Sequence, residues 1–461
     1  MQGSKPLPCN FFRITGQNMK DYIKIIEDNK EEMLQTLADL VAIPSVVSAL
    51  DGDYPYGAEV QRAYEFMMAK AEKDGFITKN VDNQGGHMDF PGKTDDLIAV
   101  VGHLDVVPAG DPANWNTDPF KAEIIDGKMY GRGTIDDKGP LLAGYYAVKA
   151  LKEAGFEPTK TIRVMLGLDE ETNWYGMEYY MEREKAPVAG FSPDAEFPVI
   201  HGEKGMISFN LTKKIDLSGE GGLRLISLKG GTVSNAVPDS AKAVIAYGDK
   251  FTEITAKGVS AHASTPELGT NAISVIFEML GSKEFAQKDA NDIIGFFNDH
   301  LGFDINGERF GIPFEDEPSG KLTLNAGIAE IENDQAKLVI DVRYPVTFTL
   351  EQVMEGVHKV CDPFGWEITE NTGAGPLYKP ADDPLVVTLM DIYKKYTGQH
   401  DAKPITMGGA TYARAVPNTV AFGPVFPGEV DLCHQPNEYI DIEDMVTSTK
   451  IFAEALYELA K

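Results

Sequence analysis

Histidine and carboxylate side chains recur in five short clusters along the chain. Taken alone, a histidine or a pair of carboxylates is more often structural or solvated than functional. Several clusters follow apolar runs typical of buried strands, however, and carboxylates gathered at that depth are prohibitively costly without cations. The pattern predicts a metal centre built from His103-Leu104-Asp105, Asp136-Asp137, Glu170-Glu171, Ser192-Pro193-Asp194 and Leu432-Cys433-His434.

The charges of the candidate ligands indicate how many ions this centre holds. Asp136, Glu171 and Asp194 carry three negative charges, whereas His103 and His434 are neutral ligands. Two divalent cations and a bridging hydroxide would make the site neutral. Oxygen and imidazole ligands without thiolate suit zinc, manganese or cobalt. We expect two divalent metal ions as cofactors, with zinc preferred and manganese or cobalt as alternatives.

Asp105 stands two residues after His103, and this spacing indicates a supporting role. In extended backbone, residues two apart point to the same side. The Asp105 carboxylate could then accept the second ring N–H of His103 and fix its tautomer and orientation. We expect Asp105 to orient a ligand; direct metal binding by Asp105 is the weaker alternative.

Alternating helices and buried strands surround the first clusters. Helical spacing of apolar residues covers 19–43, 58–74, 140–154 and 176–184. The continuous apolar run 97–101 is typical of a strand covered on both faces, and 161–168 is predicted as a second buried strand. This alternation predicts an α/β layer with helices on both faces, in which ligands bind beyond the carboxyl ends of the strands.

The pattern changes after Gly205. Runs typical of strands (207–211, 223–228, 251–255, 322–324, 337–342) mix with helical patterns at 272–280 and 350–360, and 283–321 is a long polar stretch. The first pattern returns from 383, with a helix at 385–396, a strand at 419–422 and a helix at 442–459. We predict a discontinuous catalytic domain (19–206 and 376–461), an inserted second domain (207–375) and an N-terminal extension (1–18).

Composition restricts the partners and the compartment. The 461 residues include 42 basic and 71 acidic side chains, a formal charge of −29. Nucleic acid and anionic membrane surfaces would repel such a chain, so we expect neither as a partner. The sequence shows no membrane span and no secretory signal. Cys9, Cys361 and Cys433 are too scattered for a disulfide framework, which favours a cytoplasmic location.

Longer motifs surround the clusters at 102–108 (GHLDVVP), 130–139 (YGRGTIDDKG), 169–172 (DEET) and 191–196 (FSPDAE). Jointly they resemble the di-zinc metallopeptidase family that includes carnosinase, aminoacylase and succinyl-diaminopimelate desuccinylase. The resemblance is greatest to its bacterial PepV-type dipeptidases, and it extends from about Met19 to the C-terminus. It implies a zinc-exopeptidase-like three-layer catalytic domain with a mixed β-sheet and an inserted α+β lid.

The resemblance also implies a role for each residue of the metal centre. Asp136 bridges the two ions, and the peptide bond between Asp136 and Asp137 is cis. Glu170 is the general base and binds no metal. His103 and Asp194 complete one metal site, and Glu171 and His434 complete the other.

The predicted lid carries further candidates. His262 is either an ordinary loop histidine or, as the resemblance implies, a residue that stabilises the tetrahedral oxyanion together with Asn235. Arg343 either forms a strand ion pair or captures the C-terminal carboxylate of the substrate. The resemblance favours capture, with Gly408 and Gly409 supplying backbone N–H groups.

A metal-dependent dipeptidase is the function that the resemblance implies. It would hydrolyse unblocked dipeptides, including β-alanyl ones, through a metal-activated bridging water. The alternatives are an N-acyl amino acid deacylase or desuccinylase, a carboxypeptidase and a non-catalytic pseudo-enzyme. The large insert favours a monomer, with small peptides as partners. Two departures from the PepV-type pattern are Ala410, in place of a third glycine, and Cys433, in place of a methionine.

Overall fold

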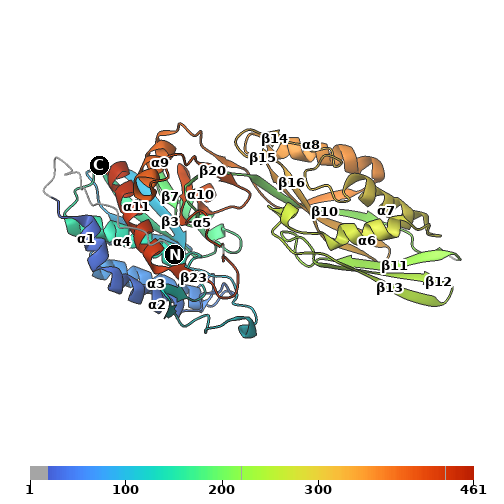
Figure 1. The fold of residues 1–461 in the computed structure, drawn as a ribbon, viewed down its shortest axis with the longest axis horizontal. Coiled ribbons are helices and arrows are strands. Elements are labelled where there is room, and N and C mark those ends of the chain that lie inside the picture. The colour runs from blue at the N-terminus through green and yellow to red at the C-terminus, as the bar shows by residue number, and fades with distance from the viewer. Residues whose placement is uncertain (1–18, 220, 431) are drawn as a thin grey trace, which may run out of the picture. The chain divides into compact units, whose positions relative to one another are not determined.

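The computed structural model describes residues 19–219, 221–430 and 432–461, so the predicted extension and Cys9 lie outside it. The chain forms two compact units, each continuous in space but not in sequence (Figure 1). The first comprises the residues up to Phe197, Asp391–His400 and Ala415–Lys461, and the second comprises Pro198–Met390 and Asp401–Arg414. The predicted domain limits at 206/207 and 375/376 remain a prediction.

The first unit contains a mixed sheet with strands in the order β1-β2-β6-β3-β7-β21. Strands β6, β3, β7 and β21 are parallel, whereas β1 and β2 add an antiparallel edge. The predicted α/β class is confirmed. The strands are β1 (Ile77–Val81), β2 (Gly85–Phe90), β3 (Thr94–His103), β6 (Lys160–Gly167), β7 (Ala189–Ser192) and β21 (Thr419–Phe422), with the short β4 (Glu123–Ile125), β5 (Lys128–Tyr130), β8 (Ala195–Glu196), β22 (Pro424–Val425) and β23 (Tyr439–Asp441) outside this sheet.

Both faces of this sheet are covered. All residues of the segment 97–103 of β3 are buried, and successive strand residues point to opposite faces. Helix α4 lies so close to β3 that a Cβ on its Gly144 would come within 2.7 Å of Val100. The helices of this unit are α1 (Tyr22–Asp28), α2 (Lys30–Val41), α3 (Ala58–Lys73), α4 (Lys138–Ala154), α5 (Tyr175–Met181) and α11 (Ile442–Ala460), while α9 (Pro384–Thr397) and α10 (Tyr412–Ala415) contain residues of both units.

The helical pattern at 19–43 forms two helices, so the single predicted helix is wrong. Asn29, between α1 and α2, has φ −88° and ψ 0°, outside the helical region. Its side chain donates to Glu153 of α4 instead. The backbone hydrogen bonds from Asn29 to the Ile25 carbonyl and from Met33 to the Asn29 carbonyl, each at 2.9 Å, still bridge the break. Among the described residues, no helix is long and apolar enough to cross a membrane.

The second unit contains an antiparallel sheet in the order β13-β12-β11-β16-β17-β10-β18. Its helices α6, α7 and α8 share one hydrophobic core with these strands (Figure 1). The helices are α6 (Ala272–Gly281), α7 (Lys288–His300) and α8 (Leu350–Cys361). The sheet strands are β10 (Gly205–Lys214), β11 (Leu223–Gly230), β12 (Ser240–Tyr247), β13 (Lys250–Lys257), β16 (Thr323–Glu332), β17 (Gln335–Tyr344) and β18 (Glu367–Ala374); further short strands are β9 (Val199–Glu203), β14 (Glu315–Asp316), β15 (Gly320–Lys321), β19 (Leu377–Tyr378) and β20 (Ile405–Met407).

Helix α7 lies within the stretch predicted only as long and polar. Ile293, Ile294, Phe296 and Phe297 form its buried stripe. The Phe297 ring stacks on Phe277 of α6, with centroids 4.0 Å apart and planes 10° from parallel. The apolar stripe is short and flanked by charged residues, so the composition of this stretch did not indicate a helix.

This packing yields a stability prediction. Phe297→Ala should lower the free energy of unfolding by about 3–5 kcal/mol, because a buried aromatic ring is replaced by a cavity. Urea denaturation followed by circular dichroism would measure the change. Phe251→Ala is the control, since the Phe251 side chain on edge strand β13 is 65% exposed. A Phe297→Ala change as small as that of the control would contradict the prediction.

Candidate active site

The predicted metal ligands of the first unit converge at the carboxyl ends of its parallel strands. His103 is the last residue of β3, and Asp194 comes two residues after β7. Glu170 and Glu171 follow β6 after a two-residue connection. Parallel strands end at the same edge of a sheet, so side chains that follow them meet there. Asp136 belongs to the loop that leads into α4.

Asp136 lies between the two histidines. Its Oδ1 is 3.2 Å from Nε2 of His103, and its Oδ2 is 3.1 Å from Nε2 of His434. His103 Nε2 is also 3.5 Å from Asp194, and His434 Nε2 is 2.9 Å from Glu171. The structure therefore brings all five predicted ligands together, with one oxygen of Asp136 facing each imidazole.

Asp137, for which no separate role was predicted, adds a further buried carboxylate. Its Oδ2 accepts the backbone N–H of His103 at 3.0 Å. This approach requires a glycine at position 102, where a Cβ would lie 2.3 Å from the same oxygen. Its other oxygen, Oδ1, is buried with no hydrogen-bond partner among the described residues. The Asp136–Asp137 peptide bond is cis, as predicted.

The electrostatics of the cluster show an excess of negative charge. Burial raises the pKa of Glu170 and of Asp137 well above the ordinary carboxyl range, with nearby carboxylates adding to the shift. Burial, with Asp136 beside it, raises the pKa of Glu171 to about 7. Hydrogen bonds to Asp136 and Glu171 raise the pKa of His434 to about 11. Groups of candidate metal ligands around His103 include Asp136 with Glu171, and Asp137 with Asp194. Such imidazole and carboxylate donors fit divalent cations.

Asp105 supports the centre mainly through the backbone of the two glutamates. Its carboxylate oxygens accept the N–H groups of Glu170 and Glu171, each at 3.1 Å. The expected contact with His103 is longer: Nδ1 of the ring is 3.5 Å from Asp105 Oδ1 and 2.9 Å from the Asp105 backbone carbonyl. Strand β3 ends at His103, so the extended geometry assumed for this pair stops there. Asp105 thus contacts the backbone of both glutamates through its carboxylate and the His103 ring through its own carbonyl, and its orienting role remains a prediction.

Arg132 and Glu438, which the sequence did not single out, connect the Asp136 loop with the segment of His434. Glu438 is fully buried, pairs with Arg132 at 2.6 Å and accepts the N–H groups of Ile135 and Asp136 at 2.9 and 3.3 Å. Arg132 also donates to the His434 carbonyl at 3.4 Å. Pairing of β5 with β23 brings the two segments together. No spacing rule joins residues so far apart in sequence.

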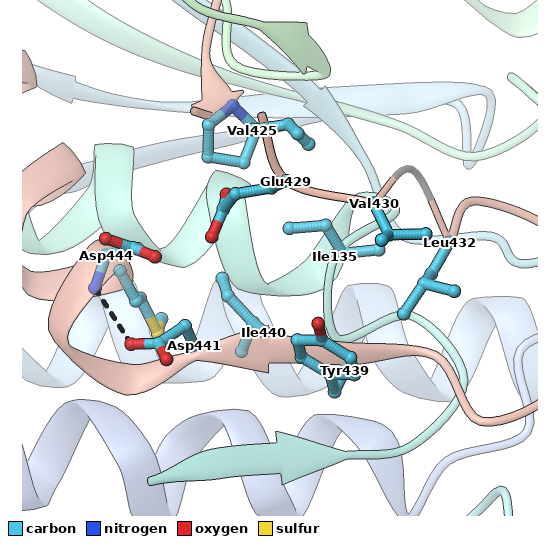
Figure 2. Close-up of a pocket in the computed structure, with 11 residues that line it drawn as sticks. Ile135, Val425, Glu429, Val430, Leu432, Tyr439, Ile440, Asp441 and Asp444 are labelled. Atoms are coloured by element: carbon cyan, nitrogen blue, oxygen red, sulfur yellow. Dashed lines mark hydrogen bonds between the residues drawn. The ribbon is translucent and has the colours of Figure 1, made fainter. Parts of the chain in front are cut away.

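A small cavity lies beside the same segments (Figure 2). Ile135 and Leu432 line one side, and Glu429 and Asp444 lie at the other. Burial and the adjacent Glu429 raise the pKa of Asp444 to about 7. The volume of about 20 Å³ has room for one water and not for a peptide. This cavity is therefore not the substrate site.

In the second unit, Asn235 and His262 lie on two paired loops. Ala236 and His262 form an antiparallel bridge, and the Asn235 carbonyl accepts the N–H of Ala263 at 2.9 Å. The His262 side chain is exposed, with Nδ1 2.6 Å from the Ser264 hydroxyl. The structure therefore places the two predicted oxyanion donors next to each other.

Arg343 forms the strand ion pair, whereas its capture of a substrate carboxylate remains a prediction. Its Nε and Nη2 donate to Asp341 at 2.8 and 3.2 Å, so the strand ion pair exists. Its Nη1 donates to the Gly408 carbonyl at 3.3 Å, which places the guanidinium against the predicted Gly408-Gly409 loop. The edge of Arg343 that Asp341 occupies is not available to a substrate carboxylate in this arrangement.

Glu203 and Arg414, also missed by the sequence analysis, hold the same glycine loop. Arg414 donates to the Gly409 carbonyl at 3.3 Å and to Glu203 at 3.2 Å. Glu203 is fully buried and accepts the Thr411 hydroxyl at 2.8 Å. Each arginine in this region thus has its own carboxylate and contacts one glycine carbonyl.

Comparison with known proteins identifies the family of this chain. The family model described as "Peptidase family M20/M25/M40" matches residues 99–458. The chain belongs to this peptidase family. Within the family, it is 37% identical to the Bacillus subtilis (strain 168) protein named "Putative dipeptidase YtjP", over 94% of this chain and 98% of that protein. It is 33% identical to a Staphylococcus epidermidis protein named "Putative dipeptidase", over 95% and 98%.

A solved structure shares the fold of this family member. The aminoacylhistidine dipeptidase from Vibrio alginolyticus aligns with a TM-score of 0.63, covering 93% of this chain and 96% of that one, at 16% identity. The match supports the overall arrangement of elements in this M20-family peptidase.

The support from Asp105 can be tested without a substrate. Asp105→Asn should weaken metal binding about 10–100-fold, because the amide cannot accept both glutamate N–H groups and loses the charge beside His103. Calorimetric titration of zinc into the metal-free protein would measure the affinity. Asp21→Asn is a matched control, since Asp21 also accepts two backbone N–H groups, at the start of α1. Equal zinc affinities for both variants would contradict the role of Asp105.

Proposed function

We propose that this M20-family peptidase is a two-metal dipeptidase that hydrolyses unblocked dipeptides. The observation that carries the proposal is Asp136, whose two oxygens face His103 and His434 while Asp194 and Glu171 stand beside them. The names of its relatives at 33–37% identity support the substrate class. When bound, two divalent cations supply Lewis-acid polarisation and neutralise the buried carboxylates.

Glu170 is the proposed general base. Burial raises its pKa well above that of a solvated glutamate, which increases its affinity for a proton. Its backbone is fixed on both sides, because its N–H donates to Asp105 and its carbonyl accepts the indole N–H of Trp174 at 2.6 Å. Glu170 would take a proton from the attacking water and pass it to the leaving amine.

The second unit would supply substrate recognition. Asn235 and His262 are the proposed donors to the oxyanion that forms during peptide hydrolysis. Arg343 and the N–H groups of Gly408 and Gly409 are the proposed site for the substrate carboxylate. Fixing this terminus limits substrate length and orients the scissile carbonyl, which accounts for a preference for short peptides.

We further propose that the metal ions are zinc, with manganese or cobalt as alternatives, and that the enzyme is a cytoplasmic monomer. The absence of thiolate from the proposed ligand set supports these metals. Elemental analysis of active protein, together with light scattering on the same sample, would test both metal content and oligomeric state. About two zinc ions per monomeric chain is the expected result.

Substitution of Glu170 separates the base from the ligands. Glu170→Gln should retain both metals and lose about 10²–10⁴ in turnover of a dipeptide such as Ala-Ala, the usual size of a general-base contribution. Glu171→Gln is the matched control and should lose metal. Loss of metal from Glu170→Gln, with full metal content in Glu171→Gln, would reverse the two assignments.

Substrate comparison tests the dipeptidase proposal directly. The wild-type enzyme should cleave dipeptides far better than tripeptides, N-acetylated dipeptides or N-acyl amino acids, and chelation should abolish the activity. Preference for N-acyl amino acids would indicate a deacylase, and preference for longer chains a carboxypeptidase. Complete inactivity of the metal-loaded protein towards all of these substrates would indicate a pseudo-enzyme.

The role of Arg343 is tested best within one variant. Arg343→Lys should reduce kcat/KM for a dipeptide much more than for its C-terminal amide, because lysine keeps the charge beside Asp341 but loses the planar fork. Comparing acid and amide in the same protein cancels any effect on stability. An equal loss for both substrates would show that Arg343 acts only through its ion pair with Asp341.

A further inference from the structure

The loop that carries Asn235 is held by a buried side chain that the proposed chemistry does not use, Asn325 of β16. Its amide nitrogen donates to the Ser234 carbonyl at 3.0 Å and to the Ala236 carbonyl at 2.8 Å. These are the carbonyls on either side of Asn235. Asn325 is 2% exposed, and a buried hydrogen bond is costly to leave unmade. One side chain therefore orients both neighbours of the proposed oxyanion donor.

The same restraint extends to His262. Besides the hydrogen bond from Ala263 to the Asn235 carbonyl, the N–H of Val237 donates to the Ala261 carbonyl at 2.8 Å. These two hydrogen bonds connect the two loops on both sides of the Ala236–His262 bridge, and one of them is made by Asn235 itself. A shift of the Asn235 loop would therefore move the His262 loop with it.

The orientation of the Asn325 amide is itself determined. Its Oδ1 accepts the side-chain amide of Asn271 at 3.1 Å, so the nitrogen must face the two loop carbonyls. Asn271 also donates to the Ala326 carbonyl at 2.9 Å and caps helix α6 by accepting the N–H groups of Ile273 and Ser274. Asn325 and Asn271 together form a clamp on the Asn235 loop. Asn325 belongs to strand β16 and Asn271 caps helix α6, so the clamp is anchored to both elements.

Strand β16 is shaped to receive this loop. A Cβ on Gly327 would come within 2.3 Å of the Ser234 carbonyl oxygen and 2.6 Å of its Cα. Only a glycine allows the loop backbone to approach the strand this closely. The register of β16 is also irregular between Ala326 and Ile328. The close contact at Gly327 places the Ser234 and Ala236 carbonyls within reach of Asn325.

The position of Asn325 also relates the loop to Arg343. Asn325 is paired with Asp341 in the antiparallel register of β16 and β17, and directly paired residues project from the same face. Asp341 holds Arg343 through its two side-chain hydrogen bonds. The proposed oxyanion donors and the proposed carboxylate site are therefore fixed from one pair of strands.

We propose that Asn325 is a positioning residue for the hydrolytic reaction, acting through Asn235 and His262 and not by contact with the substrate. The proposal rests on the function proposed above. Asn325 would set the spacing between the oxyanion donors and Arg343, the two points of this unit between which a dipeptide is held. Its contribution should appear in kcat, because the oxyanion exists only in the transition state.

A double-mutant cycle tests this role. Asn325→Ala should lower kcat about 10–100-fold, since loss of one oxyanion donor costs about 10²–10³ and a 1 Å misplacement can cost about 10². KM and metal content should stay within about twofold of the wild type. The double variant Asn235→Ala/Asn325→Ala should lose less in kcat than the product of the two single losses, because part of the effect of Asn325 passes through Asn235 and the rest through His262.

The matched control is Asn298→Ala. The Asn298 side chain donates to the Phe277 carbonyl at 2.9 Å, so this variant also removes an amide–carbonyl hydrogen bond from the second unit. Its kcat should equal that of the wild type. A kcat for Asn325→Ala as high as that of the control, or losses that multiply in the double variant, would overturn the proposal. If Asn325→Ala does not fold, Asn271→Asp provides the test, since it keeps an acceptor for the α6 cap but removes the donor to Asn325.

A readout that needs no substrate separates this proposal from the proposed function. Amide hydrogen exchange at Val237 and Ala263 should be at least about tenfold faster in Asn325→Ala, or in Asn271→Asp, than in Asn298→Ala. Unchanged exchange would overturn the positioning role even if the enzyme is a dipeptidase. Failure of the wild type to cleave dipeptides, with the exchange result as expected, would refute the dipeptidase function and leave the clamp in place.

Discussion

The concentration of negative charge at one sheet edge is the constraint on which the first unit depends. Buried carboxylates cannot be held together by packing, because each loses its hydration and repels the others. The chain gathers them at the ends of parallel strands, where backbone N–H groups, two imidazoles and the proposed cations can surround them. The cost of this arrangement explains why so many specific hydrogen bonds position the backbone of the neighbouring loops.

Backbone positioning by polar side chains recurs in both units. Asp105 holds the N–H groups of Glu170 and Glu171, and Glu438 holds the N–H group of Asp136. In the second unit the direction of the hydrogen bonds is reversed, because the Asn325 amide donates to loop carbonyls. Each of these side chains is buried, where an unmade hydrogen bond is costly and the geometry is therefore well determined. The groups proposed to contact the substrate can then lie on loops whose backbone positions are still well determined by these hydrogen bonds.

Sequence patterns predicted the strands that are covered on both faces and the helices that bury one continuous apolar face. The runs that became β3 and β6 are apolar because both faces of the sheet are covered, and the helices that became α4 and α11 carry strong apolar patterns. Strands β1 and β2 were not predicted, because β1 (ITKNV) is a largely exposed edge strand and β2 (GGHMDF), although mostly buried, carries no apolar run. Strand β12 alternates in burial and was missed beside the more distinctive β11 and β13. Motif resemblance supplied the ligand set, whereas Arg132, Glu438 and Asn325 depend on contacts between distant segments that no local pattern encodes.

Arg343 shows why a residue in a functional site can also be structural. A buried guanidinium without a carboxylate would be costly, so Asp341 makes the strand position tolerable. The same pairing fixes the planar group and leaves Nη1 directed at the Gly408 carbonyl, which restricts how a substrate carboxylate can approach. A freely rotating arginine could reach the terminal carboxylates of substrates of many different lengths. In the proposed function, an arginine held by a neighbouring strand residue would instead fix one end of the substrate, and the sheet that holds both Arg343 and Asn325 would then set the substrate length.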